Sequence, residues 1–129
     1  MLKYSYKNGV TILETNYSPL HVSSDPSKGH RPFELLISSI VGCSSGILYK
    51  ILKKKRMKVE AIQIQSNVER NKEVANKVTE ISLFYIIEGT DLKEEQIKKS
   101  MELAFKNCAM IQSVKDSIKI NESFEIINQ

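Results

Sequence analysis

The two cysteines are the residues of this 129-residue chain whose type and position best fit a chemical role. Cys43 lies in the middle of a long apolar segment, and Cys108 lies near the end of a second, amphipathic segment. A thiol within a predicted helix and a second thiol at a helix junction indicate a redox pair. The residues alone leave open a second interpretation, in which each cysteine is a small buried hydrophobic side chain.

Cys108 has the clearer local reason to be reactive. We expect Asn107 to cap a helical turn that begins at Ala109, which would place the thiol beside a helix N-terminus, where partial positive charge lowers a thiol pKa. Cys43 receives no such help from its own helix, so its activation requires a cation or a backbone donor. Its neighbours at helical spacing predict a small, mostly apolar niche formed by Ser39, Ile40, Gly46 and Ile47.

Other chemistries fit the sequence less well. His21, His30, Cys43 and Cys108 supply enough ligands for zinc, but no two of them have the spacing of a zinc motif, so we predict no metal site. The segment 42–46 (GCSSG) lies inside a predicted helix rather than at the strand-to-helix turn of a serine hydrolase. No phosphate-binding loop or dinucleotide fingerprint is present, and we expect no cofactor.

The charge distribution argues against nucleic acid as a partner. The net charge is +4, and a basic run occupies residues 53–56 (KKKR). No aromatic residues interleave this run, and cations at the end of a helix complement its dipole. Residues 1–6 do not resemble a signal peptide, and residues 35–52 contain four serines and a lysine. We therefore expect a soluble cytoplasmic protein with a core helix and no membrane span.

The pattern of elements predicts a single α+β domain over residues 1–129. Asn8-Gly9 indicates a two-residue hairpin turn between short strands. Asp91 is expected to cap a helix, with Glu94 completing a capping box. The predicted elements are strands around residues 4–6, 10–12 and 20–22, a helix from residue 32 to about 55, strands over 59–70 and 78–88, helices over 91–108 and 109–116, and a strand over 118–126.

The central predicted helix contains two glycines, Gly42 and Gly46, together with several serines. Each internal glycine costs a helix about 1 kcal/mol relative to alanine. The compensation that we expect is the close approach of another helix against the glycine-containing face.

The following segments occur in a fixed order along the chain: 31–36 (RPFELL), 42–43 (GC), 51–57 (ILKKKRM), 68–70 (VER), 85–89 (YIIEG) and 107–109 (NCA). Together they resemble the superfamily of osmotically inducible protein C (OsmC) and the organic hydroperoxide resistance (Ohr) proteins. The lysine-rich end of the central helix and the pair Glu69-Arg70 are most similar to its YhfA-like branch. The separation of the two cysteines, 108 − 43 = 65, also looks like the spacing in that family.

The resemblance implies a homodimer in which antiparallel sheets wrap around long central helices and the two chains intertwine. It also implies a thiol-dependent peroxidase of the oxidative stress response. Cys43 would attack an organic hydroperoxide and become a sulfenic acid. Cys108 would resolve this acid as an intramolecular disulfide, which an external dithiol would reduce.

The sequence departs from the peroxidase members of this family at the residues that assist the thiol. Those members have an arginine in the N-terminal strands, whereas no arginine precedes Arg31 here, and Phe33 follows the proline where they have glutamate. Glu34, Arg31 and Arg70 are the candidate supporting residues. The alternative function is therefore a dimer without peroxidase activity that binds a small hydrophobic ligand or senses redox state in an interface pocket.

Overall fold

The computed structural model describes residues 1–129, which divide into two compact units, residues 1–38 and 39–129. The observed elements follow the predicted order of three strands, one helix, two strands, two helices and one strand. The α+β class is confirmed. The prediction of one domain over the whole chain stays a prediction.

The first unit contains a three-stranded antiparallel sheet in the order β1 (Tyr4–Lys7), β2 (Val10–Leu13) and β3 (Leu20–Val22). Asn8 and Gly9 connect β1 to β2 with φ angles of 54° and 81°. Positive φ at both positions is the geometry of the predicted two-residue hairpin turn.

Helix α1 (Pro32–Lys54) begins in the first unit and continues into the second. Pro32 is favoured in a first helical turn because it has no N–H to leave unpaired, and Glu34 complements the positive end of the helix dipole. Within the second unit, α1 buries residues at four-residue spacing, which places them in one stripe: Ile40, Ser44, Leu48 and Leu52.

The expected core helix, α1, is only partly buried in the single chain. Gly42, Gly46 and Tyr49, outside the buried stripe of α1, are exposed. Only 28% of its most apolar stretch of 18 residues is buried. By length and composition α1 could cross a membrane, a test that core helices of soluble proteins also pass. The apolar sequence of α1 thus exceeds what this chain covers by itself.

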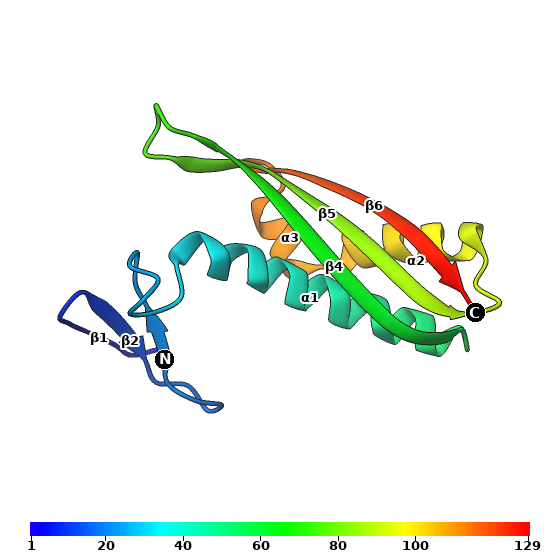
Figure 1. Ribbon diagram of the computed structural model, residues 1–129, viewed down its shortest axis with the longest axis horizontal. Helices are drawn as coiled ribbons and strands as arrows, with labels where there is room; N and C mark the ends of the chain where they lie inside the picture. The colour runs from blue at the N-terminus through cyan, green and yellow to red at the C-terminus, as the bar shows by residue number, and fades with distance from the viewer. The chain divides into compact units, whose positions relative to one another are not determined.

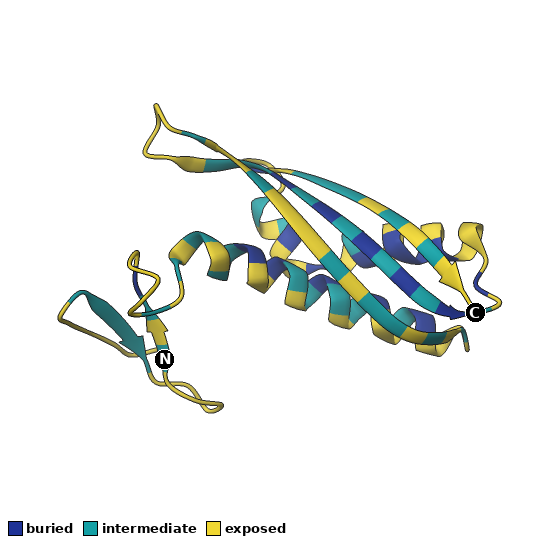
Figure 2. Ribbon diagram, viewed as in Figure 1, coloured by how far each residue is buried: buried dark blue, intermediate teal, exposed yellow.

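The second unit is built on a sheet in the order β4 (Lys58–Asn71), β5 (Lys77–Thr90) and β6 (Lys119–Asn128). In the central strand β5, alternate side chains are at most 1% exposed because they face the helices: Ile81, Leu83, Tyr85 and Ile87. Figure 2 shows this strand as a row of alternating dark blue and teal segments.

The expectation of antiparallel sheets is wrong for the second unit, whose sheet is mixed. β4 and β5 form an antiparallel hairpin, but β6 runs parallel to β5. The reason lies in the connection, since α2 (Glu94–Asn107) and α3 (Ala109–Val114) carry the chain back before β6 begins. Within the second unit, α2 and α3 lie on the same side of the sheet as α1 (Figure 1).

The predicted capping box at the start of α2 is also absent. Asp91 lies before the helix with φ 54°, and Lys93 occupies the N-cap position without a side-chain hydrogen bond. The Leu92 N–H donates instead to Asn128 Oδ1 at 2.8 Å, and Asn128 Nδ2 donates to the Leu92 carbonyl at 3.2 Å. The end of β6 therefore holds the start of α2 in place of a local cap.

Candidate functional site

Cys43 and Cys108 come from different elements of the second unit and meet in space. Cys43 projects from the middle of α1 and is partly exposed, whereas Cys108 is fully buried. Both thiols are free, and their side chains lie within hydrogen-bonding reach of each other. The two residues that are 65 positions apart in the sequence thus form one thiol pair.

Cys108 occupies the junction at which α2 ends and α3 begins. Its backbone is extended (φ −81°, ψ 109°), and its N–H donates to the Phe105 carbonyl at 3.4 Å. The Ile111 N–H donates to Cys108 Sγ at 3.4 Å, so Cys108 itself is the N-cap of α3. Asn107, the predicted cap, instead donates from Nδ2 to the Leu103 carbonyl at 2.8 Å. The helix junction thereby fixes the position of the Cys108 sulfur.

The surroundings of Cys43 favour its thiolate form. The Met110 N–H, the Cys108 thiol and the Ala109 N–H hydrogen-bond to the Cys43 sulfur and together hold its pKa below the ordinary value. Partial desolvation opposes this effect without overcoming it. The backbone donor that the sequence required for activation of Cys43 is therefore supplied by the segment that contains Cys108.

The pKa of Cys108 moves in the opposite direction. Burial raises it, and the hydrogen bond and charge of Cys43 raise it further, against the lowering effect of the Ile111 and Met110 N–H groups. The expectation that the helix start would activate Cys108 is therefore wrong, because full burial outweighs the backbone donors. The pair is asymmetric, with Cys43 the more acidic and more accessible thiol.

A buried polar contact lies next to the thiol pair and had no counterpart in the sequence analysis. Ser44 Oγ and the Tyr85 hydroxyl form a hydrogen bond of 2.7 Å, and both residues are at most 1% exposed. Burial raises the pKa of Tyr85, and the charge of Cys108 contributes in the same direction. This contact joins α1 to the central strand β5 beside Cys108.

Glu122 is the second polar residue that the sequence analysis missed. It lies on β6 opposite Leu83, on the side of the sheet that faces the helices. Burial raises its pKa, the Tyr85 hydroxyl lowers it in part, and Oε2 is buried without a hydrogen bond. A signal was present in the sequence, because a glutamate interrupts the alternating apolar series of Ile118, Ile120, Phe124 and Ile126.

Two of the candidate supporting residues, Arg31 and Glu34, pair with each other. Arg31 Nε donates to Glu34 Oε1 at 2.8 Å, and the two side chains are 43% and 49% exposed. This ion pair raises the pKa of Arg31 and lowers that of Glu34. Both residues belong to the first unit, whereas the polar groups that shift the pKa of Cys43 all come from residues 108–110 in the second.

Arg70, the third candidate, lies near the end of β4. Its Nε donates to the Asn76 carbonyl at 2.9 Å, within the turn that joins β4 to β5. Asn76 has a φ of 57°, so this hydrogen bond ties the arginine to a tight turn. The contact gives Arg70 a local structural role in the hairpin.

The comparison with protein families identifies the chain over most of its length. The model of the OsmC-like protein family matches residues 25–123. Protein YhfA of Escherichia coli strain K12 is 26% identical over an alignment of 129 positions. This alignment covers 97% of this chain and 96% of that protein.

Solved structures share the fold at lower sequence identity. The OsmC-like protein from Mycoplasma pneumoniae superposes with a TM-score of 0.86 at 15% identity and covers 99% of this chain and 96% of its own. The organic hydroperoxide resistance protein OhrB of Bacillus subtilis has a TM-score of 0.63 at 13% identity, with 98% of each chain covered. The resemblance noted in the sequence is thereby confirmed, and the chain belongs to the OsmC-like family.

Proposed function

We propose that this protein is a thiol-dependent peroxidase that reduces organic hydroperoxides through Cys43 and Cys108. The observation that carries this proposal is the asymmetry of the thiol pair, in which Cys43 has a lowered pKa and Cys108 a raised one. A thiolate is the nucleophile in such chemistry, so Cys43 attacks the hydroperoxide while Cys108 remains a protonated thiol. Structural neighbours named organic hydroperoxide resistance proteins support the choice of substrate class.

The reaction has three balanced steps. The Cys43 thiolate attacks an oxygen of the O–O bond, which yields Cys43 sulfenic acid and an alkoxide that takes up a proton and leaves as an alcohol. The Cys108 thiol then attacks the sulfenic sulfur, forms the disulfide and releases water. An external dithiol returns both cysteines to thiols and becomes a disulfide itself.

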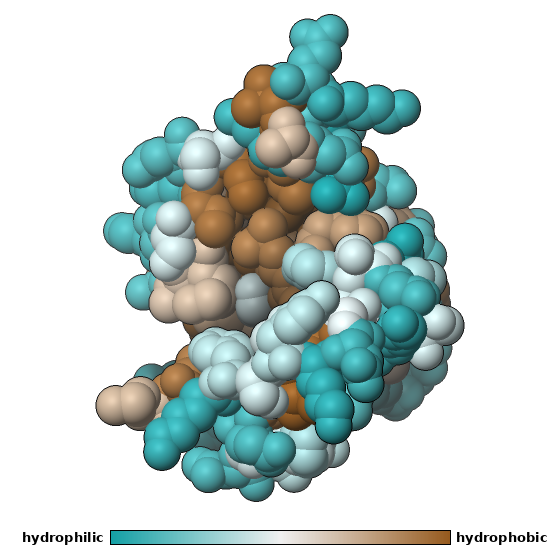
Figure 3. All heavy atoms as spheres, turned by 90° about the vertical axis from the view of Figure 1, so that its left-hand side faces the viewer, coloured by the Kyte–Doolittle hydropathy of each residue, from teal (hydrophilic) through white to brown (hydrophobic).

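We further propose that the protein works as a cytoplasmic homodimer in which α1 meets its copy. A Cβ added at Gly42 or Gly46 would have no atom within 4 Å, so this part of α1 is open in the single chain. A groove of about 370 Å³ between α1 and β4 runs beside it, lined in part by Gly46, Tyr49 and Ile62. Figure 3 shows a broad area of apolar side chains at the surface. A second helix can approach the glycine-containing face of α1 closely, because glycine has no side chain to hold the two backbones apart.

The deciding experiment treats the reduced protein with one equivalent of cumene hydroperoxide and maps the cysteines by mass spectrometry. We expect rapid formation of a Cys43–Cys108 disulfide in the unmodified protein. Cys108→Ser should stop at a Cys43 sulfenic acid that dimedone traps, and Cys43→Ser should consume no peroxide. If both thiols of the unmodified protein stay reduced while the peroxide persists, the peroxidase proposal is wrong and the alternative of a ligand-binding dimer replaces it.

A further inference from the structure

A cavity of about 630 Å³ lies between α2 and β6, within the second unit. Its volume is in the range that holds a small organic molecule. Neither cysteine lines it, so it is separate from the thiol pair. The lining residues from α2 are Glu94, Lys98, Met101, Glu102 and Phe105, and those from β6 are Glu122, Ser123 and Phe124.

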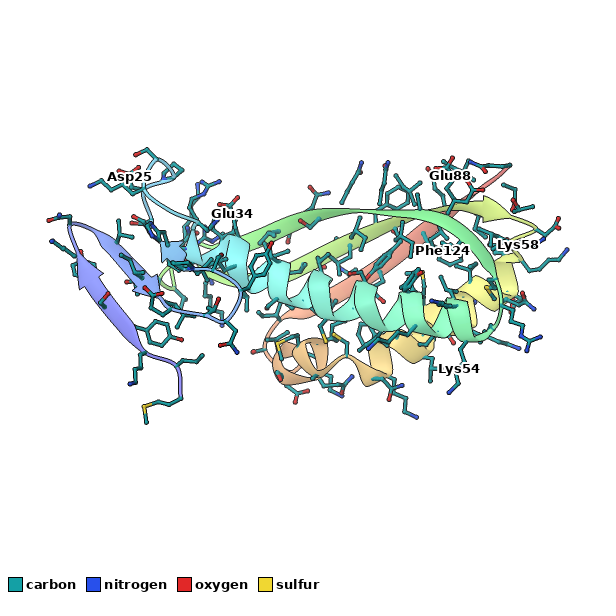
Figure 4. All side chains as sticks on the ribbon, turned by 90° about the horizontal axis from the view of Figure 1, so that it is seen from below. Asp25, Glu34, Lys54, Lys58, Glu88 and Phe124 are labelled. Carbon is teal, nitrogen blue, oxygen red and sulfur yellow. The ribbon has the colours of Figure 1, made fainter.

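Apolar side chains line part of this cavity on both sides. Met101 is only 6% exposed, and Phe105 and Phe124 are partly buried. In Figure 4, Phe124 lies on the side of the sheet that faces the helices, and Glu88 lies on the opposite side. Two aromatic rings and a thioether favour a ligand with an apolar body, and they also favour a nearby cation.

Glu122 gives the cavity one specific polar group. It lies on the cavity wall, and its Oε2 is buried without a hydrogen-bond partner. An unpaired buried acceptor is costly, and most such groups in proteins are satisfied by a partner, a water molecule or a ligand. A ligand that donates a hydrogen bond to this carboxyl group would remove that cost.

The charges around the cavity determine which donor fits. Three carboxyl groups line it, those of Glu94, Glu102 and Glu122, against the single ammonium of Lys98. A carboxylate or phosphate ligand would be repelled, whereas an ammonium supplies three donors and a positive charge. We propose that the cavity between α2 and β6 binds a small amphipathic primary amine, with its apolar body between Phe105 and Phe124 and its ammonium on Glu122.

The test uses three probes that share a phenylethyl body, applied to the reduced protein at pH 8. Binding is measured by isothermal titration calorimetry and by amide chemical shifts in NMR. We expect 2-phenylethylamine to bind at least about tenfold more tightly than 2-phenylethanol, and 3-phenylpropanoate not to bind. The largest shifts should lie at Met101, Phe105 and Ser123. Equal binding of amine and alcohol, or no binding of the amine at millimolar concentration, would overturn the proposal.

Substitutions distinguish a specific contact of the amine with Glu122 from a general effect of negative charge on amine binding. Glu122→Gln keeps the shape of the side chain and should weaken amine binding at least about tenfold. Glu125→Gln removes the same charge from an exposed position of the same strand and should leave amine binding unchanged. Lys98→Gln removes the opposing cation and should strengthen amine binding, a gain that misfolding cannot produce. Equal losses in Glu122→Gln and Glu125→Gln, or weaker binding in Lys98→Gln, would contradict the assigned site.

Discussion

The Cys43 and Cys108 side chains lie within hydrogen-bonding reach of each other, and their pKa values are shifted in opposite directions. The Met110 N–H is the main cause that lowers the pKa of Cys43, and burial is the main cause that raises that of Cys108. The Cys108 thiol donates to Cys43 and favours its thiolate, and the resulting negative charge disfavours ionisation of Cys108. Backbone N–H groups of α3 act on both sulfurs, but only Cys108 is fully buried. The division of roles between the two thiols thus follows from their unequal burial.

The contact predicts how Cys108 variants alter Cys43. Cys108→Ala removes a donor and should raise the Cys43 pKa, whereas Cys108→Ser keeps a hydroxyl donor and should leave it low. The pH dependence of iodoacetamide alkylation, followed by mass spectrometry, measures this pKa. In the unmodified protein Cys43 should react at lower pH than Cys108. Identical profiles for the two variants would show that the thiol contact does not tune Cys43.

The hydrogen bond between Ser44 and Tyr85 predicts a coupled loss of stability. Tyr85→Phe leaves the buried Ser44 hydroxyl unpaired and should lower the free energy of unfolding by about 1–3 kcal/mol. Ser44→Ala should be costly for the same reason. The double variant should lose less than the sum of the two single losses, because neither member of the Ser44–Tyr85 hydroxyl pair then remains without the other. Urea unfolding of the four proteins gives the coupling energy, and strictly additive losses would argue against the bond.

Glu122 predicts a specific dependence of stability on pH. Its folded-state pKa lies above the ordinary value of 4.5, so the folded protein favours the protonated form. As pH rises from about 4.5 through the raised pKa, ionisation of Glu122 costs the folded state stability, and the cost levels off above that pKa. Glu122→Gln has no such cost and should gain stability relative to the unmodified protein over this range.

Urea unfolding at a series of pH values measures this gain. Glu125→Gln is the matched control, since it removes a carboxyl group from the exposed side of the same strand, β6. A constant difference between Glu122→Gln and the unmodified protein at all pH values would mean that Glu122 does not titrate abnormally.

The exposed face of α1 around Gly46 allows a substitution that should weaken association of two chains without disturbing the fold of one. Gly46→Leu meets no atom within 4 Å of its new Cβ, so the single chain should fold as before. In a dimer with closely packed α1 helices, the larger side chain should shift the equilibrium toward monomer. Analytical ultracentrifugation measures the shift, and circular dichroism checks the fold. Lys54→Leu adds the same side chain at the exposed end of the helix and should leave association unchanged.

The ion pair between Arg31 and Glu34 predicts that neither residue tunes the pKa of Cys43. Because their side chains pair with each other and are exposed, Arg31→Gln and Glu34→Gln should leave the alkylation pKa of Cys43 unchanged. A rise in that pKa in either variant would show that this ion pair supports the thiolate after all.

Local patterns in the sequence were sufficient for the order and type of the elements. Asn8-Gly9 forced a hairpin turn through its backbone conformation, and alternation from Ile81 to Ile87 marked a strand with one buried side. Both signals depend on residues close in the chain, so no tertiary information was needed. The family resemblance likewise came from short segments in a fixed order.

The tertiary structure decided the direction of β6, the real caps of α2 and α3, and the chemistry of the thiols. Strand direction depends on where a connection returns the chain, and the cap of α2 depends on Asn128, 36 residues away. The sequence predicted Cys43 and Cys108 as a pair, but its local pattern placed the lowered pKa at Cys108 rather than at Cys43, the thiol that the family resemblance implied as the nucleophile. A pKa depends on burial and on donors from distant segments, and only the folded chain brings the Met110 N–H to Cys43 and buries Cys108 completely.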